Sequence, residues 1–398
     1  MRWIMAMVLL WVGIGNVEAE FVWSFTPLGD LPGGDIYGWP NGAFYSYPFG
    51  VSDDGNVVVG ASRSAAAGAY YEAFRWTEAK GMVGLGDLAG GRFWSAAYGI
   101  SGDGAVIIGT SESSVDYEAF RWTEAEGMVG LGDLAGGKFY SQAGDVSVDG
   151  SVVVGWSYSA VGNEAFRWTK AGGMVGWGSL GGGISADGSV VVGGDPTTNQ
   201  PFRWTEGGGM VGLGSLDGGG FQSGASKVSA DGSTVVGYSR TSKQGESEAF
   251  RWTAAEGMVG LGDLPDRGGT IYQSHALGVS ADGSTVVGLG NSKGRNEAFV
   301  WDETNGMRDL KDVLVRGGLG SELTGWWLER ANDVSADGRT LVGWGVNPSG
   351  QFEAWRAKIG EGSGPPAAVP ELSTFLLVGL GLGVAGLFGY RDHRRHAT

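Results

Sequence analysis

The sequence contains no cysteine and only three histidines in 398 residues. Without cysteine the chain can form neither a disulfide framework nor a thiolate metal site, and it has no thiol nucleophile. Between residues 20 and 371 His275 is the only histidine, which excludes metal sites built from several histidines and leaves a histidine-dependent triad only one base. We interpret this single histidine as a surface loop residue. The sequence therefore predicts no catalytic residue, no metal site and no cofactor.

Basic residues are also few, with 27 Lys and Arg against 43 Asp and Glu and a formal net charge of −16. Binding to nucleic-acid phosphates requires clustered Lys and Arg, so the composition predicts no nucleic-acid partner. Helical periodicity is absent between Glu20 and Gly364, which favours an all-β fold over this whole region.

What the sequence does contain is a set of short motifs that recur in a fixed order. Ser-x-Asp-Gly opens each unit, and the segment EAFRW or a variant of it follows. Leu-Gly-Asp-Leu or a variant closes every unit except the last. The opening motif occurs seven times at intervals of 38 to 55 residues, with its aspartates at Asp54, Asp103, Asp149, Asp187, Asp231, Asp282 and Asp337. A period of this size indicates a repeat architecture.

One unit, residues 229–264, shows the local pattern. Asp231-Gly232 between two apolar runs predicts a tight hairpin, because glycine accepts the positive φ that such a turn needs. Runs rich in β-branched and aromatic residues at 234–238, 248–253 and 258–261, with a short apolar run before each hairpin, predict four strands. Four strands per unit match one blade of a β-propeller. We therefore predict a single seven-bladed β-propeller over residues 20–359.

The two ends of the repeat region complement each other. Residues 27–31 repeat the closing motif, whereas the last unit, 331–359, has the hairpin and an aromatic segment but no closing motif. The N-terminal strand can thus complete the last blade and close the ring, which removes exposed sheet edges. Phe21-Val22-Trp23 also resembles the aromatic segment, and in this scheme it would be an extra copy.

The segments outside the repeats carry targeting patterns. Residues 1–19 combine Arg2, an apolar run and Val17-Glu18-Ala19, which predicts a signal peptide cleaved after Ala19, with an uncleaved anchor as the alternative. Residues 360–371 form a linker rich in Gly, Pro and Ala. Residues 372–390 carry no charge, which predicts a transmembrane helix. The basic tail, 391–398, is expected in the cytoplasm.

The C-terminal segment and the repeats each resemble a known family. Val369, Pro370 and Glu371, followed by the apolar span and by Arg391, Arg394 and Arg395, resemble the PEP-CTERM sorting signal of exopolysaccharide-forming Gram-negative bacteria. The motifs EAFRWT, GMVGLGDL and VSADGSTVVG resemble the HAF repeats of extracellular proteins that often carry this signal. Leu372 stands where the signal usually has a second proline, and Glu replaces the name-giving His of the repeats.

The resemblance implies a propeller-like fold and a location at the cell surface or in the extracellular matrix, without an established activity. It also implies an exosortase-type sorting protease as a partner, acting while the C-terminal helix holds the protein in the membrane.

Aromatic residues gather in the variable segment between each closing motif and the next hairpin. Aromatic faces stack on sugar rings as well as on neighbouring side chains, so these residues are either ligand contacts or loop packing. The candidates for ligand contact are Trp39, Tyr45, Trp94, Tyr140, Tyr272, Trp326 and Trp327. The fourth unit lacks almost all of this segment, so a surface built from the variable segments is interrupted there.

Acidic residues, in contrast, recur in register from unit to unit. Residues that are repeated in every blade solve a structural problem in every blade, whereas catalytic groups belong to one site. Each Asp-Gly turn offers one or two carboxylates, and a calcium site needs about six oxygens, so a structural turn is favoured. We therefore expect a non-catalytic surface or matrix protein associated with extracellular polysaccharide. A polysaccharide-cleaving enzyme with paired carboxylates and a purely structural coat protein are the alternatives.

Overall fold

The structure is a computed structural model that describes residues 23–34, 45–68, 70–178, 180–195, 197–216, 223–240, 246–265, 273–292 and 294–360. The chain divides into two compact units, Met1–Glu361 and Gly362–Thr398, and all described residues belong to the first. The expected signal peptide, sorting motif, apolar span and basic tail lie outside the described residues. Among the helices of the described part, none is long and apolar enough to cross a membrane.

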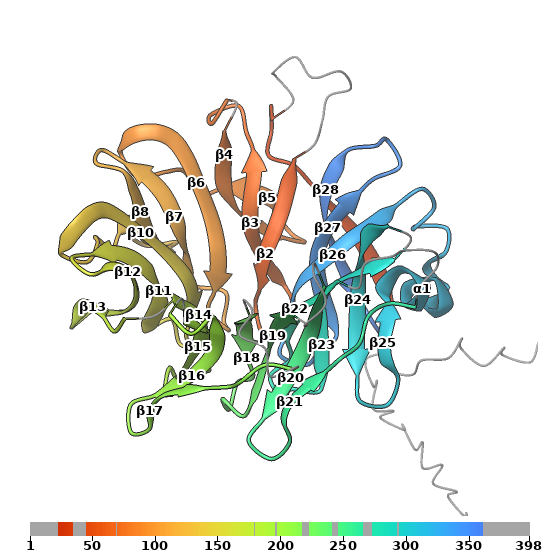
Figure 1. Cartoon of the computed structure of the whole chain (residues 1–398). Coiled ribbons are helices and arrows are strands. Elements are labelled where there is room, and N and C mark those ends of the chain that lie inside the picture. Colours follow the sequence, from red (N-terminus) through yellow and green to blue (C-terminus); the bar gives the residue numbers. More distant parts are fainter. Residues whose placement is uncertain are drawn as a thin grey trace, which may run out of the picture. The chain divides into compact units, whose positions relative to one another are not determined.

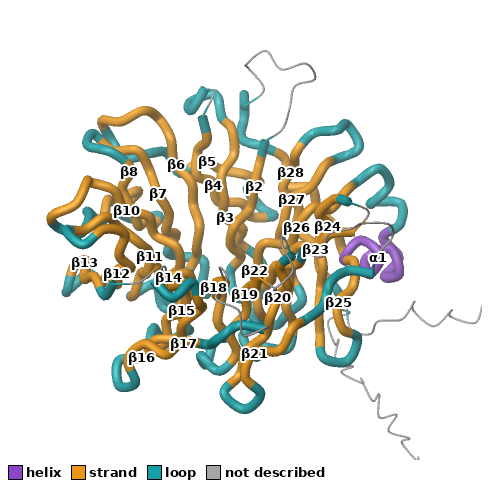
Figure 2. The backbone as a smooth tube through the Cα atoms, viewed as in Figure 1, coloured by secondary structure: helices purple, strands orange, loops and turns teal. Residues whose placement is uncertain are grey.

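The described residues form seven four-stranded antiparallel sheets, which are the blades of a β-propeller (Figures 1 and 2). This confirms the predicted fold. Blade 1 consists of β2 (Ser46–Val51), β3 (Val57–Arg63), β4 (Tyr71–Thr77) and β5 (Gly81–Gly84), and blade 2 of β6 (Gly90–Ile100), β7 (Ile107–Ser113), β8 (Tyr117–Thr123) and β9 (Gly127–Gly130). Blade 3 consists of β10 (Gly136–Val146), β11 (Val152–Ser159), β12 (Gly162–Thr169) and β13 (Gly173–Gly176).

The remaining blades follow in the same order along the chain. Blade 4 consists of β14 (Leu180–Ile184), β15 (Val190–Asp195), β16 (Gln200–Thr205) and β17 (Gly209–Gly212), and blade 5 of β18 (Ser223–Val228), β19 (Thr234–Arg240), β20 (Ser247–Thr253) and β21 (Gly257–Gly260). Blade 6 consists of β22 (Ser274–Val279), β23 (Thr285–Ser292), β24 (Arg295–Asp302) and β25 (Gly306–Asp309). Blade 7 consists of β26 (Trp327–Val334), β27 (Thr340–Val346), β28 (Phe352–Lys358) and β1 (Ser24–Gly29).

Blade 7 closes the ring by combining strands from the two ends of the repeat region, as predicted. β1 pairs antiparallel with β28, with Ser24 opposite Lys358. Phe25 lies opposite Ala357 in the position that Met82 takes opposite Trp76 in blade 1. β1 is therefore an outermost strand, and Trp23, which precedes it, belongs to no extra aromatic strand.

The Ser-x-Asp-Gly motif forms the tight turn between the first two strands of every blade. In all seven turns the Ser hydroxyl donates to the Asp carboxylate over 2.5–2.7 Å, and the Gly φ lies between 69° and 74°. In blade 2, for example, the Ser101 hydroxyl and the Ala105 N–H lower the pKa of the Asp103 carboxyl. The recurring aspartates thus stabilise the predicted hairpin in its ionised form.

These turns also connect the blades to one another. The N–H of the second motif residue donates to the carbonyl of the equivalent residue in the next blade, from Asp53 to Gly102 and onward through Val148. The last of these bonds runs from the Ala336 N–H back to the Asp53 carbonyl. Seven backbone hydrogen bonds of 2.9–3.2 Å therefore form an unbroken cycle at one end of the strands.

The core is built from the aromatic segment of each unit. Phe74, the first aromatic residue of blade 1, is completely buried, as are its equivalents in other blades, including Trp355 in blade 7. Its ring packs against Gly60 of the neighbouring strand, where a Cβ would overlap the Tyr47 carbonyl and press on the ring. The glycine of the second strand is therefore required by close packing.

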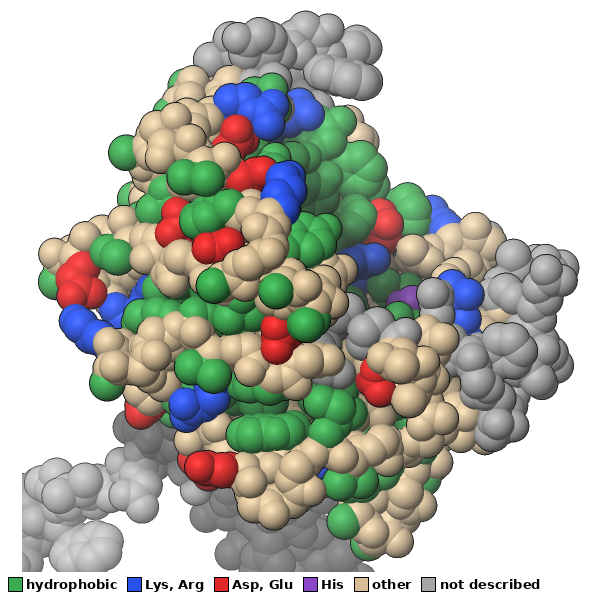
Figure 3. Space-filling model, turned by 60° about the vertical axis from the view of Figure 1, so that its left-hand side comes forward, with side chains coloured by type: hydrophobic (Ala, Val, Ile, Leu, Met, Phe, Trp, Pro, Cys, Tyr) green, Lys and Arg blue, Asp and Glu red, His purple; other side chains and the backbone are tan. Residues whose placement is uncertain are grey.

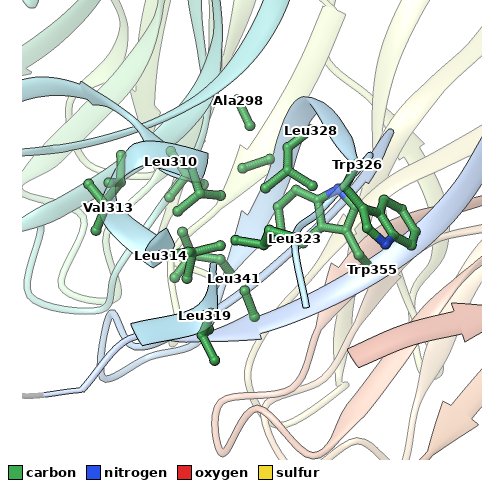
Figure 4. Close-up of a cluster of buried hydrophobic side chains, with 14 of the residues drawn as sticks. Ala298, Leu310, Val313, Leu314, Leu319, Leu323, Trp326, Leu328, Leu341 and Trp355 are labelled. Carbon is green, nitrogen blue, oxygen red and sulfur yellow. The ribbon is translucent and has the colours of Figure 1, made fainter. Parts of the chain in front are cut away.

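One helix departs from the sequence prediction of a region without helices. α1 (Leu310–Leu314) follows β25 directly and continues into a π-helical turn, η1 (Val315–Leu319). Asp309, the aspartate of the last closing motif, caps α1 by accepting from the Asp312 N–H. Leu310, Val313 and Leu314, spaced i, i+3, i+4, cover the core between blades 6 and 7. Figure 4 shows these residues on one side of the cluster, with Trp326 and Trp355 on the other.

Candidate ligand-binding face

The two ends of the strands differ in what they carry. We call the end with the Ser-x-Asp-Gly turns the turn face, and the end with the variable segments and the connections between second and third strands the loop face. The turn face repeats from blade to blade, whereas the loop face does not. Figure 3 shows one side of the propeller, where hydrophobic side chains reach the surface in patches between scattered acidic and basic side chains. Binding residues are expected at variable connections on a rigid scaffold.

The aromatic candidates from the sequence have different environments. Tyr45, Trp94, Tyr140 and Trp327 are partly exposed. Trp326 is only 5% exposed and packs in the core, where its ring meets Phe25 at 5.1 Å between centroids, so it is a packing residue. Trp39 and Tyr272 lie outside the described residues.

Blades 2 and 3 bring five aromatic rings together, which we call the twin cluster: Trp94, Tyr117, Tyr140, Trp156 and Tyr158. Tyr140 is central, with Trp156 stacked on it at 4.8 Å between centroids and Tyr117 at 5.8 Å. Trp94 meets Tyr117 edge-on at 5.0 Å. All five side chains are partly exposed, so the cluster is a continuous aromatic surface across two blades.

A second group lies where blade 7 meets blade 1, and we call it the seam cluster: Tyr45, Tyr47, Tyr71, Trp344 and Phe352. Tyr47 meets Trp344 edge-on, with 5.1 Å between the ring centroids, and the centroids of Tyr45 and Phe352 are 5.7 Å apart. Burial, followed by the neighbouring Tyr71, raises the pKa of Tyr47 far above its ordinary value. All five rings are partly exposed.

Seven of these ten rings were not among the sequence candidates, and all seven lie in strands of the blades: Tyr47, Tyr71, Tyr117, Trp156, Tyr158, Trp344 and Phe352. Trp156 and Trp344 follow the glycine of the second strand, a position that is Ala61 in blade 1, Thr110 in blade 2 and Gly194 in blade 4. Variation at one position inside an otherwise constant motif was the available signal.

Two arginines lie over the rings of the seam cluster. The Arg63 guanidinium carbon is 4.2 Å from the Tyr45 ring centroid, and that of Arg330 is 5.6 Å from the Trp344 centroid. The Nε atoms of both side chains are buried without a hydrogen-bond acceptor. Burial lowers the pKa of Arg330 from its ordinary value, against the attraction of Glu329, but an arginine stays charged at neutral pH.

His275 is not the surface loop residue that we expected. It lies in β22, which begins at Ser274, before the apolar run seen in the sequence. Its ring stacks on Tyr238 at 4.4 Å and contacts the Ser247 hydroxyl through Nε2 at 2.8 Å. Burial, together with the charges of Arg330 and Arg240, lowers the pKa of His275 to about 4, so the imidazole is neutral at pH 7.

The axis of the propeller holds a cavity of about 120 Å³ lined by residues from all seven blades. One position of the first strand, two residues before the hairpin Ser, is glycine in four blades and charged in three. In chain order it is Gly50, Gly99, Asp145, Gly183, Lys227, Gly278 and Asp333. The three charged residues line the cavity together.

The axial charges are bound to one another and to the next blades. Asp145 accepts from Lys227 Nζ at 2.9 Å and from the Ile184 N–H of blade 4 at 3.1 Å. Asp333 accepts from the Val51 N–H of blade 1 at 3.0 Å. Burial by itself lowers the pKa of Lys227, but the two carboxylates outweigh burial and raise it. The axial carboxylates therefore link blade 3 to blade 4, which follows a shortened connection, and blade 7 to blade 1, where the ring closes.

These residues offer aromatic faces, guanidinium groups and buried carboxylates. Among the described residues, no group of three His, Cys, Asp or Glu side chains is placed to hold a metal ion. The loop face supplies aromatic surface and two arginines without carboxylate partners in the described part of the chain. The axial carboxylates are engaged by Lys227 and by backbone N–H groups.

Comparisons with known proteins give the fold alone. No family model and no curated protein matches the chain. The propeller domain of the trilobed protease from Pyrococcus furiosus is 12% identical, with a TM-score of 0.52, over 79% of this chain and 95% of that one. Oligogalacturonate lyase from Vibrio parahaemolyticus is also 12% identical, with a TM-score of 0.52, over 85% and 98% of the two chains.

A weaker likeness is to TolB from Acinetobacter baumannii, at 12% identity and a TM-score of 0.41. There the match covers 66% of this chain and 62% of the TolB chain. Solved structures of this kind thus show that the chain is similar to β-propellers of different activities, and they leave its own activity to be inferred from its residues.

Proposed function

We propose that this protein is a secreted propeller that binds extracellular polysaccharide at its loop face without cleaving it, at the cell surface or in the matrix. The twin cluster carries the proposal, because it presents five touching, partly exposed aromatic rings across two blades. An extended aromatic surface suits successive sugar rings, which offer apolar faces for stacking.

The variation between blades supports ligand contact over simple packing. Aromatic residues that pack the core are repeated in every unit and are fully buried, as Phe120 and Phe166 are in the same two blades. Trp156, in contrast, corresponds to Thr110 in blade 2 and Gly194 in blade 4, so the fold does not require an aromatic ring there. A feature that the scaffold does not need is a candidate for function.

The location is supported by the two ends of the sequence. The signal-peptide pattern of residues 1–19 and the resemblance of residues 369–395 to a sorting signal both fit export, followed by membrane anchoring and processing by an exosortase-type protease. Binding of polysaccharide outside the cell requires this export, so the two parts of the proposal belong together.

A glycan array tests the binding, followed by titration of the best glycan with purified protein. The Trp94→Ala/Tyr140→Ala variant should lose about tenfold or more in affinity, because central aromatic contacts dominate binding surfaces. Trp168→Ala is the matched control, since Trp168 is also partly exposed but pairs with Met174 toward the turn face of the same blade. Equal affinity of both variants would place the ligand elsewhere.

The two alternative functions have their own readouts. Release of shorter fragments from the cell's own polysaccharide would establish a cleaving enzyme. A protein that binds no glycan on the array, and that does not co-purify with extracellular polysaccharide, would be a structural coat component, and the proposal would be wrong.

A further inference from the structure

The arginines of the seam cluster point to the charge of the ligand. Arg63 and Arg330 come from blades 1 and 7. Their side chains lie over Tyr45 and Trp344, and the ring of Phe352 contacts both of these aromatic residues. Both are partly exposed. Within the described part of the chain neither forms an ion pair, although other surface arginines do, such as Arg92 with Glu112 and Arg121 with Glu126.

An arginine held in this way is costly unless it has a partner. The Nε atoms of Arg63 and Arg330 are buried and without an acceptor, and burying a cationic donor without pairing it is unfavourable. Stacking on an aromatic ring fixes the guanidinium plane and leaves its edge available for a carboxylate or another anion. Glu329, the neighbour of Arg330 in sequence, opposes the lowering of the Arg330 pKa by its negative charge.

We propose that the seam cluster is a subsite for the acidic groups of a polysaccharide, so that the ligand is an acidic polysaccharide such as a polyuronate. This rests on the polysaccharide binding proposed above. The rings of Tyr47, Tyr71 and Trp344 contact the sugar, and Arg63 and Arg330 bind its carboxylates through charge-assisted hydrogen bonds.

The acidic net charge of the chain does not oppose this assignment at physiological salt. Charges separated by more than about 8 Å are largely screened there, so the local arginines decide the interaction with a bound sugar. Binding of the acidic polymer should therefore strengthen as the salt concentration is lowered, because the arginine contacts dominate. Weaker binding at low salt would mean that long-range repulsion dominates.

A matched pair of polymers tests the proposal: polygalacturonate and its fully methyl-esterified form, which has the same backbone without charge. We expect the purified protein to bind polygalacturonate about tenfold or more tightly than the ester, because hydrogen bonds to charged groups are the stronger ones. Arg63→Gln and Arg330→Gln should each lose about tenfold for polygalacturonate and leave binding of the ester unchanged. Arg121→Gln, which removes a paired arginine of similar exposure, is the control.

The outcomes separate this inference from the function on which it rests. Equal binding of both polymers, unaffected by either substitution, overturns the acidic subsite and leaves polysaccharide binding intact. Absence of any glycan binding overturns both. Tighter binding of a single-stranded oligonucleotide than of polygalacturonate would also overturn the assignment, since stacked aromatic and basic residues suit that polymer too.

The melting temperature of each variant shows whether a loss of binding comes from misfolding. If a glutamine variant melts well below the parent, Arg63→Lys and Arg330→Lys replace it, because they keep the charge and lose the planar fork. The lysine variants should retain the preference for the charged polymer at reduced affinity. Loss of that preference with the fold intact would count against a charge-reading role.

Discussion

At the scale of single residues, the two aromatic side chains of each EAFRW segment contribute differently to the stability of the fold. Phe250 is completely buried, whereas Trp252 is only partly buried against the same cluster. Phe250→Ala should therefore lower the free energy of unfolding by about 3–5 kcal/mol, and Trp252→Ala should lower it by less. Chemical denaturation of both variants measures the difference. A larger loss for Trp252→Ala would contradict the assignment of Phe250 to the centre of the core.

Asp333 makes stability depend on pH in an unusual direction for a carboxylate. Burial, opposed by Lys227, raises the pKa of Asp333 to about 6, above the ordinary value of about 3.9 in an unfolded chain. The folded state thus binds the proton more tightly, so this contribution is fully present below about pH 4 and is lost as the pH rises through about 6.

Asp333→Asn isolates this effect, because an amide oxygen can still accept from the Val51 N–H but does not titrate. The stability of the parent relative to the variant should fall by about 1–3 kcal/mol between pH 4 and pH 7. Denaturation curves over that range decide the matter. A difference that stays constant, or that grows with pH, would mean that Asp333 is ionised at low pH in the folded state.

At the scale of elements, β1 determines whether the ring is closed. Its hydrogen bonds cover the edge of β28 in blade 7, and Phe25 packs against Trp326. Removal of residues 20–31 should expose that edge and speed hydrogen exchange in β27 and β28 as well as in blade 1. Mass spectrometry of exchanged peptides makes the measurement. If only residues 32–76 lose protection, β1 has no part in blade 7.

The strands and the closure could be predicted because seven units repeat the same signals. Each copy of Ser-x-Asp-Gly marks one turn, and the missing closing motif after Ile359 has its counterpart at residues 27–31. α1 could not be predicted, because Leu310, Val313 and Leu314 make little more than one turn after a motif that elsewhere only ends a strand.

The candidate site was less visible in the sequence than the fold. Its place in a variable segment predicts a ligand contact for Trp326, yet Leu310 and Leu323 pack with it in the core. Trp344 carries no signal of its own in the sequence, because an aromatic residue is ordinary in a strand whichever way it faces. Sequence patterns identify strands, but the partners of a ring depend on how neighbouring blades are placed.

At the scale of the whole molecule, the C-terminal segments predict processing. An apolar span followed by arginines holds a protein in the membrane, and the basic end is costly to move through the bilayer. Pro370→Ala with Glu371→Ala should therefore leave full-length protein in the membrane, whereas the parent matures to a shorter surface or released form. Mass spectrometry of the extracellular fraction shows which is present. A peptide ending at Thr398, found equally in parent and variant, would make the segment an ordinary anchor.

The closure of blade 7 also sets the end of the propeller at which the described chain enters and leaves. Lys358 lies opposite both Ser24 and Thr340, beside the last Ser-x-Asp-Gly turn, so the described chain enters and leaves the propeller at its turn face. Any tether attached after Gly360 therefore starts from the repeated, invariant side of the ring. The two aromatic clusters lie at the other end of the strands, so a partner attached to either terminus of the described chain leaves them uncovered.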